Sequence, residues 1–444
     1  MFPVVTRPRP PGSLKLASSS LRRCFSAQQQ QEQQQPQQEA PAGELAPGAA
    51  IPPPIPSTVL QHNAEIVEAL RGKLILAPLT RGGNLPFRRL CADFGAEALM
   101  SEMAFARMLL KGDRKEAAML RRAPNEQLFG FQFATNVIEE GVRAAEAAAA
   151  AGANWVDLNC GCPIYEATRR GLGAALLRKP SKLARLVEGI AHRSPIPLTV
   201  KIRLGKSASE INVEETVKLL GSTGAAAVTV HGRTMEQRYK KPADWNLIST
   251  TANAAAIPVI GNGDILTYYE ARRHLEESGC LAVMVGRGAL VKPWIFEEFR
   301  LGRELLPTTD ERVGIYRRLA CYMKEHFGDD ERGKRKAFYF LPPLPEVVLG
   351  EQSRQQPLIN TRWSGVAWTE VGEEEGDVPP LERLLRCQNP NGFEPMANVL
   401  WDSASDAEAV AGLQRLAEEN VGQWEVELQA SSRGGEREDA VAEG

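Results

Sequence analysis

The chain contains 444 residues, of which 43% are hydrophobic, and carries a formal net charge of −2 at pH 7. A chain of this length can bury a large core and is expected to hold two folded units with tails. Its apolar runs are too short to cross a membrane, and its seven cysteines lack the spacing of a structural zinc site. We therefore expect neither membrane nor metal partners, and a reducing compartment.

The first 30 residues have the composition of an organellar transit peptide, because they contain arginine and serine but no acidic residue. The run RRCFSA at 22–27 resembles a mitochondrial processing site. We expect residues 1–30 to direct the protein to a mitochondrion or a plastid. An ordinary disordered tail, and hence a cytoplasmic protein, is the alternative. Residues 31–70 contain a Gln-rich run and a Pro/Ala stretch, which predict a disordered linker.

Eight short apolar runs alternate with amphipathic or Ala-rich segments between residues 71 and 305. This alternation is typical of a parallel sheet covered by helices, and eight units fit a (β/α)8 TIM barrel better than an open doubly wound sheet. An open sheet stays possible, but no G-x-G-x-x-G follows the first run. The expected strands are 73–79, 98–103, 128–133, 155–159, 198–202, 226–231, 257–261 and 281–285.

The remainder of the chain predicts a smaller, poorly defined helical C-terminal region over residues 306–425. Helical patterning is clear at 311–327 and again at 406–420, but prolines interrupt it beyond about residue 340. Residues 426–444 are expected to form a disordered acidic tail. Residues 370–444 contain eighteen acidic and five basic residues, so the preceding part of the chain is basic. A basic body is compatible with a polyanionic partner, although solubility alone also explains it.

A Gly-Cys-Pro loop follows the fourth expected strand and places Cys162 at its C-terminal end. Parallel α/β enzymes keep their chemistry at these strand ends, although a small buried thiol is the alternative. We expect Cys162 rather than Cys160 to be functional, since Pro163 fixes the loop. Polar or glycine residues at the other strand ends should converge on the same face: Thr80, Gln132, Asn159, Lys201, Arg203, His231, Arg233, Asn262, Gly263, Asp264, Gly286 and Arg287.

The loops after the last two strands are rich in glycine, at 261–264 and 286–288. Their backbone N–H groups, with Arg287 beside them, predict the phosphate cradle usual in this barrel, whereas tight turns are the alternative. Flavin mononucleotide (FMN) would suit such a site, with its phosphate in the cradle and its ring across the barrel mouth. Lys201 would then place positive charge near the ring and stabilise the anionic reduced form.

Residues 71–340 resemble the tRNA-dihydrouridine synthase family, and their motifs are most similar to those of the eukaryotic branch that modifies uridine 47 of tRNA. The resemblance is carried by LAPLT at 76–80, GNLPFRR at 83–89, LNCGCP at 158–163, HGRT at 231–234, QRY at 237–239, ADW at 243–245, GNGDI at 261–265, GRGAL at 286–290 and KPW at 292–294. After residue 340 the sequence departs from the pattern of the family's tRNA-binding helical domain.

The resemblance implies a role for individual residues. Cys162 would be the catalytic cysteine, Asn159 would hold the target uracil, and NADPH would be the reductant. FMN contacts would come from Pro78, Leu79, Thr80, Gln132, Lys201, His231, Asn262, Gly263, Asp264, Gly286 and Arg287.

The residues themselves add two expectations. A thiol with a pKa of roughly 8.5 is protonated at neutral pH, so Cys162 is expected to act as a general acid. Arg203, Arg233 and Arg238 are expected to hold tRNA phosphates.

Together these expectations describe a monomeric FMN-dependent enzyme that reduces the C5=C6 bond of a uridine in tRNA with NAD(P)H. Two alternatives stay open. The chain is a non-catalytic tRNA-binding paralogue, or it is a flavin-dependent reductase of a small pyrimidine.

Overall fold

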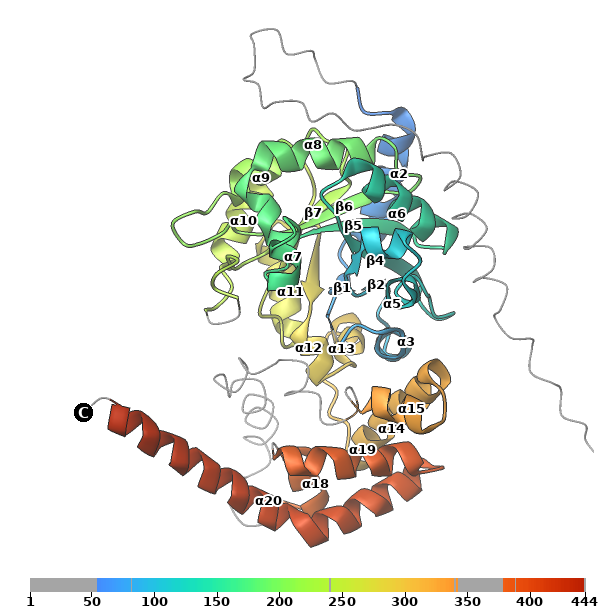
Figure 1. Cartoon of the computed structure of the whole chain (residues 1–444), viewed down its shortest axis with the longest axis vertical. Coiled ribbons are helices and arrows are strands. Elements are labelled where there is room, and N and C mark those ends of the chain that lie inside the picture. The colour runs from blue at the N-terminus through green and yellow to red at the C-terminus, as the bar shows by residue number, and fades with distance from the viewer. Residues whose placement is uncertain are drawn as a thin grey trace, which may run out of the picture.

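The computed structural model describes residues 54–80, 82–238, 241–338, 341, 378–387 and 389–442. Within them, eight parallel strands close into a barrel surrounded by helices (Figure 1), as the alternating pattern predicts. The barrel strands are β1 (Leu74–Leu76), β2 (Ala98–Met100), β4 (Leu128–Ala134), β5 (Trp155–Cys160), β6 (Leu198–Arg203), β7 (Ala227–His231), β8 (Val259–Asn262) and β9 (Ala282–Val285). The pairing of β2 with both β1 and β4 closes the ring, and short β3 (Ala104–Phe105) pairs with β4 outside it.

Helices follow the strands in sequence and cover the outside of the barrel, burying an apolar layer against it. They are α3 (Leu85–Asp93), α4 (Ala106–Leu110), α5 (Arg114–Ala118), α6 (Ile138–Ala150), α7 (Tyr165–Thr168), the 3₁₀ helix η1 (Gly173–Arg178), α8 (Pro180–Ala191), α9 (Val213–Leu220), α10 (Trp245–Ala254), α11 (Tyr268–Glu277), α12 (Arg287–Val291) and α13 (Ile295–Leu301). In the part of the chain that the structure describes, no helix is long and apolar enough to span a membrane.

The barrel contains a packed apolar core. The indole of Trp155 is fully buried in it, with Ile75, Met100 and Met284 in the same cluster. Gly130 on β4 makes room for this ring, since a Cβ there would lie 2.3 Å from Trp155 Cε2. The core therefore fixes the spacing of β4 and β5, the two strands that carry Gln132, Asn159 and the loop of Cys162.

Residues 57–70 correct the prediction of a disordered linker over 31–70. They form helix α2 (Ser57–Leu70), whose buried residues include Ile66 and Leu70. These two side chains belong to the same apolar cluster as Trp155, and the Asn63 amide donates to the Gly224 carbonyl at 2.9 Å. Apolar residues at helical spacing thus override the flexible composition that precedes them. The expected transit peptide at 1–30 lies outside the described residues.

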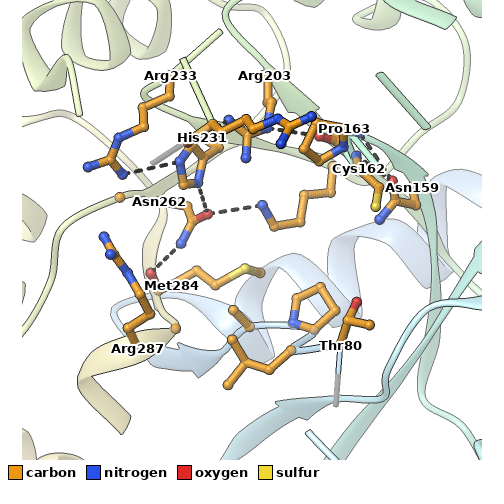
Figure 2. Close-up of a pocket in the computed structure, with 18 of the residues that line it drawn as sticks. Thr80, Asn159, Cys162, Pro163, Arg203, His231, Arg233, Asn262, Met284 and Arg287 are labelled. Atoms are coloured by element: carbon orange, nitrogen blue, oxygen red, sulfur yellow. Dashed lines mark hydrogen bonds between the residues drawn. The ribbon is translucent and has the colours of Figure 1, made fainter. Parts of the chain in front are cut away.

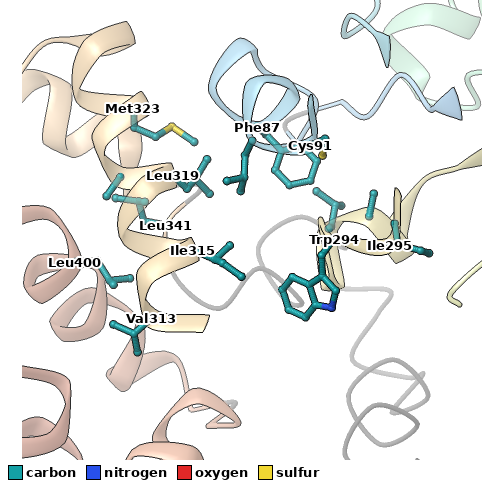
Figure 3. Close-up of a cluster of buried hydrophobic side chains, with 14 of the residues drawn as sticks. Phe87, Cys91, Trp294, Ile295, Val313, Ile315, Leu319, Met323, Leu341 and Leu400 are labelled. Atoms are coloured by element: carbon teal, nitrogen blue, oxygen red, sulfur yellow. The ribbon is translucent and has the colours of Figure 1, made fainter. Parts of the chain in front are cut away.

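A helical region packs against the barrel, as predicted for residues 306–425 (Figure 1). Figure 3 shows the join, where Phe87 and Trp294 from the barrel helices approach Ile315 and Leu319 of α14. The described helices of this C-terminal region are α14 (Thr309–Phe327), α15 (Glu331–Ala337), α18 (Pro380–Leu385), η3 (Pro390–Gly392), α19 (Phe393–Asp402) and α20 (Asp406–Ala442). Helix α20 continues to Ala442, so residues 426–442 differ from the disordered tail expected at 426–444.

Candidate active site

A cavity of about 520 Å³ lies at the carboxyl ends of the barrel strands. Every site residue expected from the sequence lines it. They are Pro78, Leu79, Thr80, Gln132, Asn159, Cys162, Lys201, Arg203, His231, Arg233, Arg238, Asn262, Gly263, Asp264, Gly286 and Arg287. Figure 2 shows Cys162 and Asn159 at one side of the cavity and Arg233 and Arg287 at the other. The expectation that residues at the carboxyl ends of the strands converge on one face is therefore confirmed, whereas their individual roles stay predictions.

The loop that carries Cys162 is held by defined hydrogen bonds. The backbone N–H groups of Gly161 and Cys162 donate to Asn159 Oδ1 at 3.2 and 2.9 Å. The Cys162 carbonyl accepts from the Ala174 N–H at 3.0 Å. Gly173 has a φ of +60°, and a Cβ there would lie 2.6 Å from the Cys162 carbonyl oxygen, so only glycine fits. These contacts fix the direction in which the thiol points.

The two cysteines of the loop lie in different environments. Cys160 ends β5 inside the apolar layer and is completely buried, whereas Cys162 lines the cavity. Burial raises the pKa of the Cys162 thiol above its ordinary value, and the hydrogen bond from the Ile164 N–H and the positive charges of Arg203 and Lys201 oppose this only in part. The thiol is therefore protonated at neutral pH, which suits a proton donor and not a thiolate nucleophile.

Lys201, His231 and Asn262 meet in the cavity wall. Asn262 donates from Nδ2 to the Met284 carbonyl at 2.8 Å, which leaves its Oδ1 to accept from Lys201 Nζ at 2.9 Å and from His231 Nδ1 at 2.8 Å. His231 therefore carries its proton on Nδ1. Burial, with the nearby cations, lowers the pKa of His231 well below 6.5, so its imidazole is neutral. Burial also lowers the pKa of Lys201 to about 8.

A cluster of two arginines and one carboxylate lies beyond β8 and β9. Arg233 Nη2 donates to both oxygens of Asp264 at 2.6 Å, and Arg287 Nη2 donates to Asp264 Oδ1 at 3.0 Å. Asp264 itself adopts a φ of +47° and also accepts from the Ala243 N–H. Two cations share one anion, so this end of the cavity keeps a net positive charge.

The arginines expected to hold tRNA phosphates differ in what they offer. Arg203 is buried, and its guanidinium donates to the carbonyls of Gly161, Thr234 and Arg238. Arg233 is buried too and forms the ion pair with Asp264. Both side chains hold loops of the site, which makes them poor candidates for free phosphate contacts. Arg238 is exposed at the cavity rim, and its expected contact with a tRNA phosphate stays a prediction.

Some lining residues were not anticipated from the sequence. Ile164 and Tyr165 follow Pro163 and lie exposed at the cavity wall, and Tyr165 has 73% of its surface accessible. An apolar residue after a loop gives no signal of this position. Asp157 lies behind the lining residues, within the expected strand 155–159; it is fully buried and accepts from Gln132 Nε2 at 2.8 Å.

The residues present fit a flavin mononucleotide. The cavity volume falls within the range of roughly 300–1,000 Å³ usual for cofactor sites. Lys201 hydrogen-bonds to a neutral amide and not to a carboxylate, so its charge is available to an anionic ring. In the arginine cluster, Asp264 and Arg287 follow the last two strands, where the phosphate is expected, and Arg233 follows β7 beside them. The donor set and its polarity therefore match a ring at Lys201 and a phosphate near Arg287.

Comparison with known proteins assigns the chain to a family. A family model described as dihydrouridine synthase (Dus) matches residues 75–341, which is more than half of the chain. The chain belongs to the dihydrouridine synthase family. The match covers the whole barrel and the first helices after it, including every residue that lines the cavity.

Curated relatives share this part of the chain. A human protein named tRNA-dihydrouridine(47) synthase (NAD(P)(+))-like is 38% identical over 316 residues, which cover 68% of this chain and 48% of the relative. Its Arabidopsis thaliana namesake is 38% identical over 338 residues, covering 73% and 49%. The tRNA-dihydrouridine(47) synthase (NAD(P)(+)) of Cryptococcus neoformans is 40% identical over 287 residues, covering 61% and 40%. The chain thus spans about half the length of the curated relatives it matches.

Proposed function

We propose that this dihydrouridine synthase family member is an FMN-dependent enzyme that reduces the C5=C6 bond of a uridine in tRNA with NAD(P)H. The observation that carries the proposal is the position of the Cys162 thiol beside Asn159, in a cavity whose opposite wall is lined by Arg233 and Arg287. Relatives named for position 47 support uridine 47 as the target. FMN bound along Lys201 and Arg287 would supply the hydride to C6.

The chain's own residues account for the remaining chemistry. Asn159 orients the uracil ring, and Cys162 donates its proton to C5, which leaves a thiolate that regains a proton from solvent. The positive charges of Lys201 and Arg203 stabilise that thiolate, since both favour the charged form of Cys162. Because a base inside folded tRNA cannot reach the cavity, we propose that the target uridine is extruded from its stack.

Binding of tRNA is proposed for the cavity rim and the helical region. Arg238 and Lys241 are exposed near the cavity, and Arg332, Arg335 and Lys336 are exposed on α15. Exposed cations at both places suit a phosphate backbone, and the affinity for tRNA should fall steeply as salt rises. The acid-free leader at 1–30 supports a mitochondrial or plastid location, and we propose a monomer.

One experiment separates the proposal from its alternatives. The full chain is purified with its flavin and incubated with NADPH and either unmodified tRNA or free uridine and uracil. Dihydrouridine in the tRNA, mapped by mass spectrometry of nuclease fragments, supports the synthase. Reduction of the free pyrimidines alone favours a small-molecule reductase. Binding of tRNA without NADPH oxidation favours a non-catalytic paralogue.

A further inference from the structure

A relay of hydrogen bonds connects a buried carboxylate with the loop of Cys162. Asp157 is completely buried and does not line the cavity. Its Oδ1 accepts from Thr199 Oγ1 at 2.6 Å, and its Oδ2 accepts from Gln132 Nε2 at 2.8 Å. Gln132 Oε1 in turn accepts from Asn159 Nδ2 at 2.8 Å, and Asn159 Oδ1 accepts from the Cys162 N–H. The relay crosses β4, β5 and β6.

The direction of this relay is fixed at both ends. Backbone N–H groups can only donate, so the Asn159 atom that faces the loop must be its oxygen. The Asn159 nitrogen then faces Gln132, which must present its oxygen, and the Gln132 nitrogen faces Asp157. An ionised carboxylate can only accept. Turning either amide around would set donor against donor, and a buried donor without a partner is costly.

Asp157 is suited to the role of a fixed acceptor. Burial raises its pKa to about 6, while the bonds from Thr199 and Gln132 and the charge of Lys201 oppose the rise. The carboxylate is therefore mainly ionised at neutral pH. Lys201 and Cys160 are titratable groups that interact with its charge, and Cys160 stays protonated because burial and the Asp157 charge both raise its pKa.

The consequence appears in the cavity beside the thiol. Asn159 Oδ1 is engaged by two backbone N–H groups, whereas Asn159 Nδ2 uses one hydrogen for Gln132 and retains a second. Figure 2 shows this amide next to the Cys162 side chain at the cavity edge. The free edge of Asn159 is therefore a donor. Uracil carries a carbonyl oxygen on the carbon next to C5, whereas cytosine carries an amino group there.

We propose that Asp157 is a positioning residue which, with the backbone N–H groups of the Cys162 loop at the other end, holds the polarity of the relay, so that Asn159 offers a donor and selects the uracil carbonyl beside C5 over the cytosine amino group. The selectivity rests on the proposed function, whereas the polarity of the relay does not. Asp157 acts only through Gln132 and Asn159, since it contacts neither the cavity nor the ring.

A reciprocal exchange tests the relay. In Asn159→Asp, an oxygen of the new carboxylate lies against Gln132 Oε1. Gln132 cannot turn around, because Asp157 accepts a hydrogen bond from its Nε2, so the two oxygens repel each other. Adding Asp157→Asn lets Gln132 turn around and donate to position 159. The new amide at 157 then donates to Gln132 and accepts from Thr199. The two bonds that Gln132 makes are thereby rebuilt in the opposite direction, while the bonds from Thr199 and from the loop N–H groups keep theirs.

Thermal unfolding of the four proteins in the cycle is the deciding measurement. We expect Asn159→Asp to lower Tm by roughly 5 °C, and the double variant to recover most of that loss. Independent structural roles would give additive losses, with the double variant less stable than either single one. Additive losses would overturn the proposal. Thermal unfolding requires no catalytic turnover, so it tests the relay whether or not the protein reduces uridine.

Uridine reduction then tests the selectivity. Asp157→Asn is the comparison, because the new amide can keep its oxygen towards Gln132 while its nitrogen donates to the Thr199 hydroxyl. This variant should keep its flavin and lose less uridine reduction than the double variant, because the backbone N–H groups of the loop still hold Asn159 in its original orientation. The double variant should also keep its flavin but lose at least about tenfold in kcat/KM, because position 159 then offers no donor. A double variant as active as the wild type would refute the donor assignment.

Discussion

Lys201→Met should stabilise the protein without its flavin while weakening flavin binding. The folded state lowers the pKa of Lys201 from 10.5 to about 8 because the ammonium is removed from water. The charged form is therefore disfavoured in the folded state relative to the unfolded chain. Its replacement leaves no orphan acceptor, since Asn262 Oδ1 still receives the proton of His231 Nδ1.

The magnitude follows from the pKa change. At about 1.36 kcal/mol per pKa unit, a fall from 10.5 to about 8 corresponds to roughly 3 kcal/mol of unfolding free energy lost at neutral pH. Solvent in the open cavity screens part of this cost, and Asp157 loses a neighbouring positive charge in the variant. We therefore expect a net gain of about 1–2 kcal/mol for Lys201→Met at pH 7.

Urea unfolding of the flavin-free wild type and variant measures this difference. The cost of the charge is complete below about pH 8 and disappears as pH rises towards 10.5, so the two stabilities should converge over that range. Added FMN should reverse the order at neutral pH, because only the wild type gains the ion pair. A flavin-free variant less stable than the wild type, or a difference independent of pH, would refute the reasoning.

Three further substitutions test other parts of the site and its support. Cys162→Ala should keep its flavin content but reduce uridine at least about 100-fold more slowly, as judged by mass spectrometry of tRNA. Gly173→Ala should lower the unfolding free energy by about 1–3 kcal/mol, measured in urea, and slow uridine reduction, because a Cβ would strike the Cys162 carbonyl. Glu126→Ala should lower the unfolding free energy by about 3–5 kcal/mol, measured by thermal unfolding, because the buried Arg88 loses the Glu126 carboxylate that pairs with it.

Each of these changes has a matched control in the chain. Cys160→Ala removes the buried thiol of the same loop and should keep uridine reduction. Gly152→Ala shares a positive φ but meets no atom within 4 Å, so a loss equal to that at position 173 would contradict the contact argument. Glu325→Ala removes the exposed partner of Arg89 and should cost less than about 1 kcal/mol. Equal losses at positions 126 and 325 would contradict the role of burial.

The strand pattern predicted the barrel and its cavity because both depend on spacing along the chain. Each expected strand overlaps an observed one, and residues after parallel strands must converge on one face. The sequence favoured Cys162 over Cys160 because Pro163 was expected to fix the loop, and the structure places Cys162 in the cavity wall and Cys160 in the apolar layer. The catalytic role of Cys162 stays a prediction. Helix α2 escaped prediction because its apolar stripe follows directly on a Pro/Ala-rich stretch.

The hydrogen-bond partners within the site required the structure. Arg203 and Arg233 occur where a phosphate contact is expected, but their guanidinium groups bind carbonyls and Asp264 instead. The relay from Asp157 to Asn159 depends on the facing of amides on neighbouring strands. Composition and spacing do not predict the orientation of these side-chain amides. The strand register decides it, because the register determines which donors and acceptors lie opposite one another.

The most direct test of the central claim is the reaction of wild type and Cys162→Ala with unmodified tRNA and NADPH, read as dihydrouridine by mass spectrometry. The account predicts that wild-type protein adds two hydrogen atoms to a single tRNA uridine, and that the variant retains flavin but makes almost no product. Wild-type protein that holds flavin and binds tRNA yet leaves every uridine unreduced would contradict it, as would undiminished activity in Cys162→Ala.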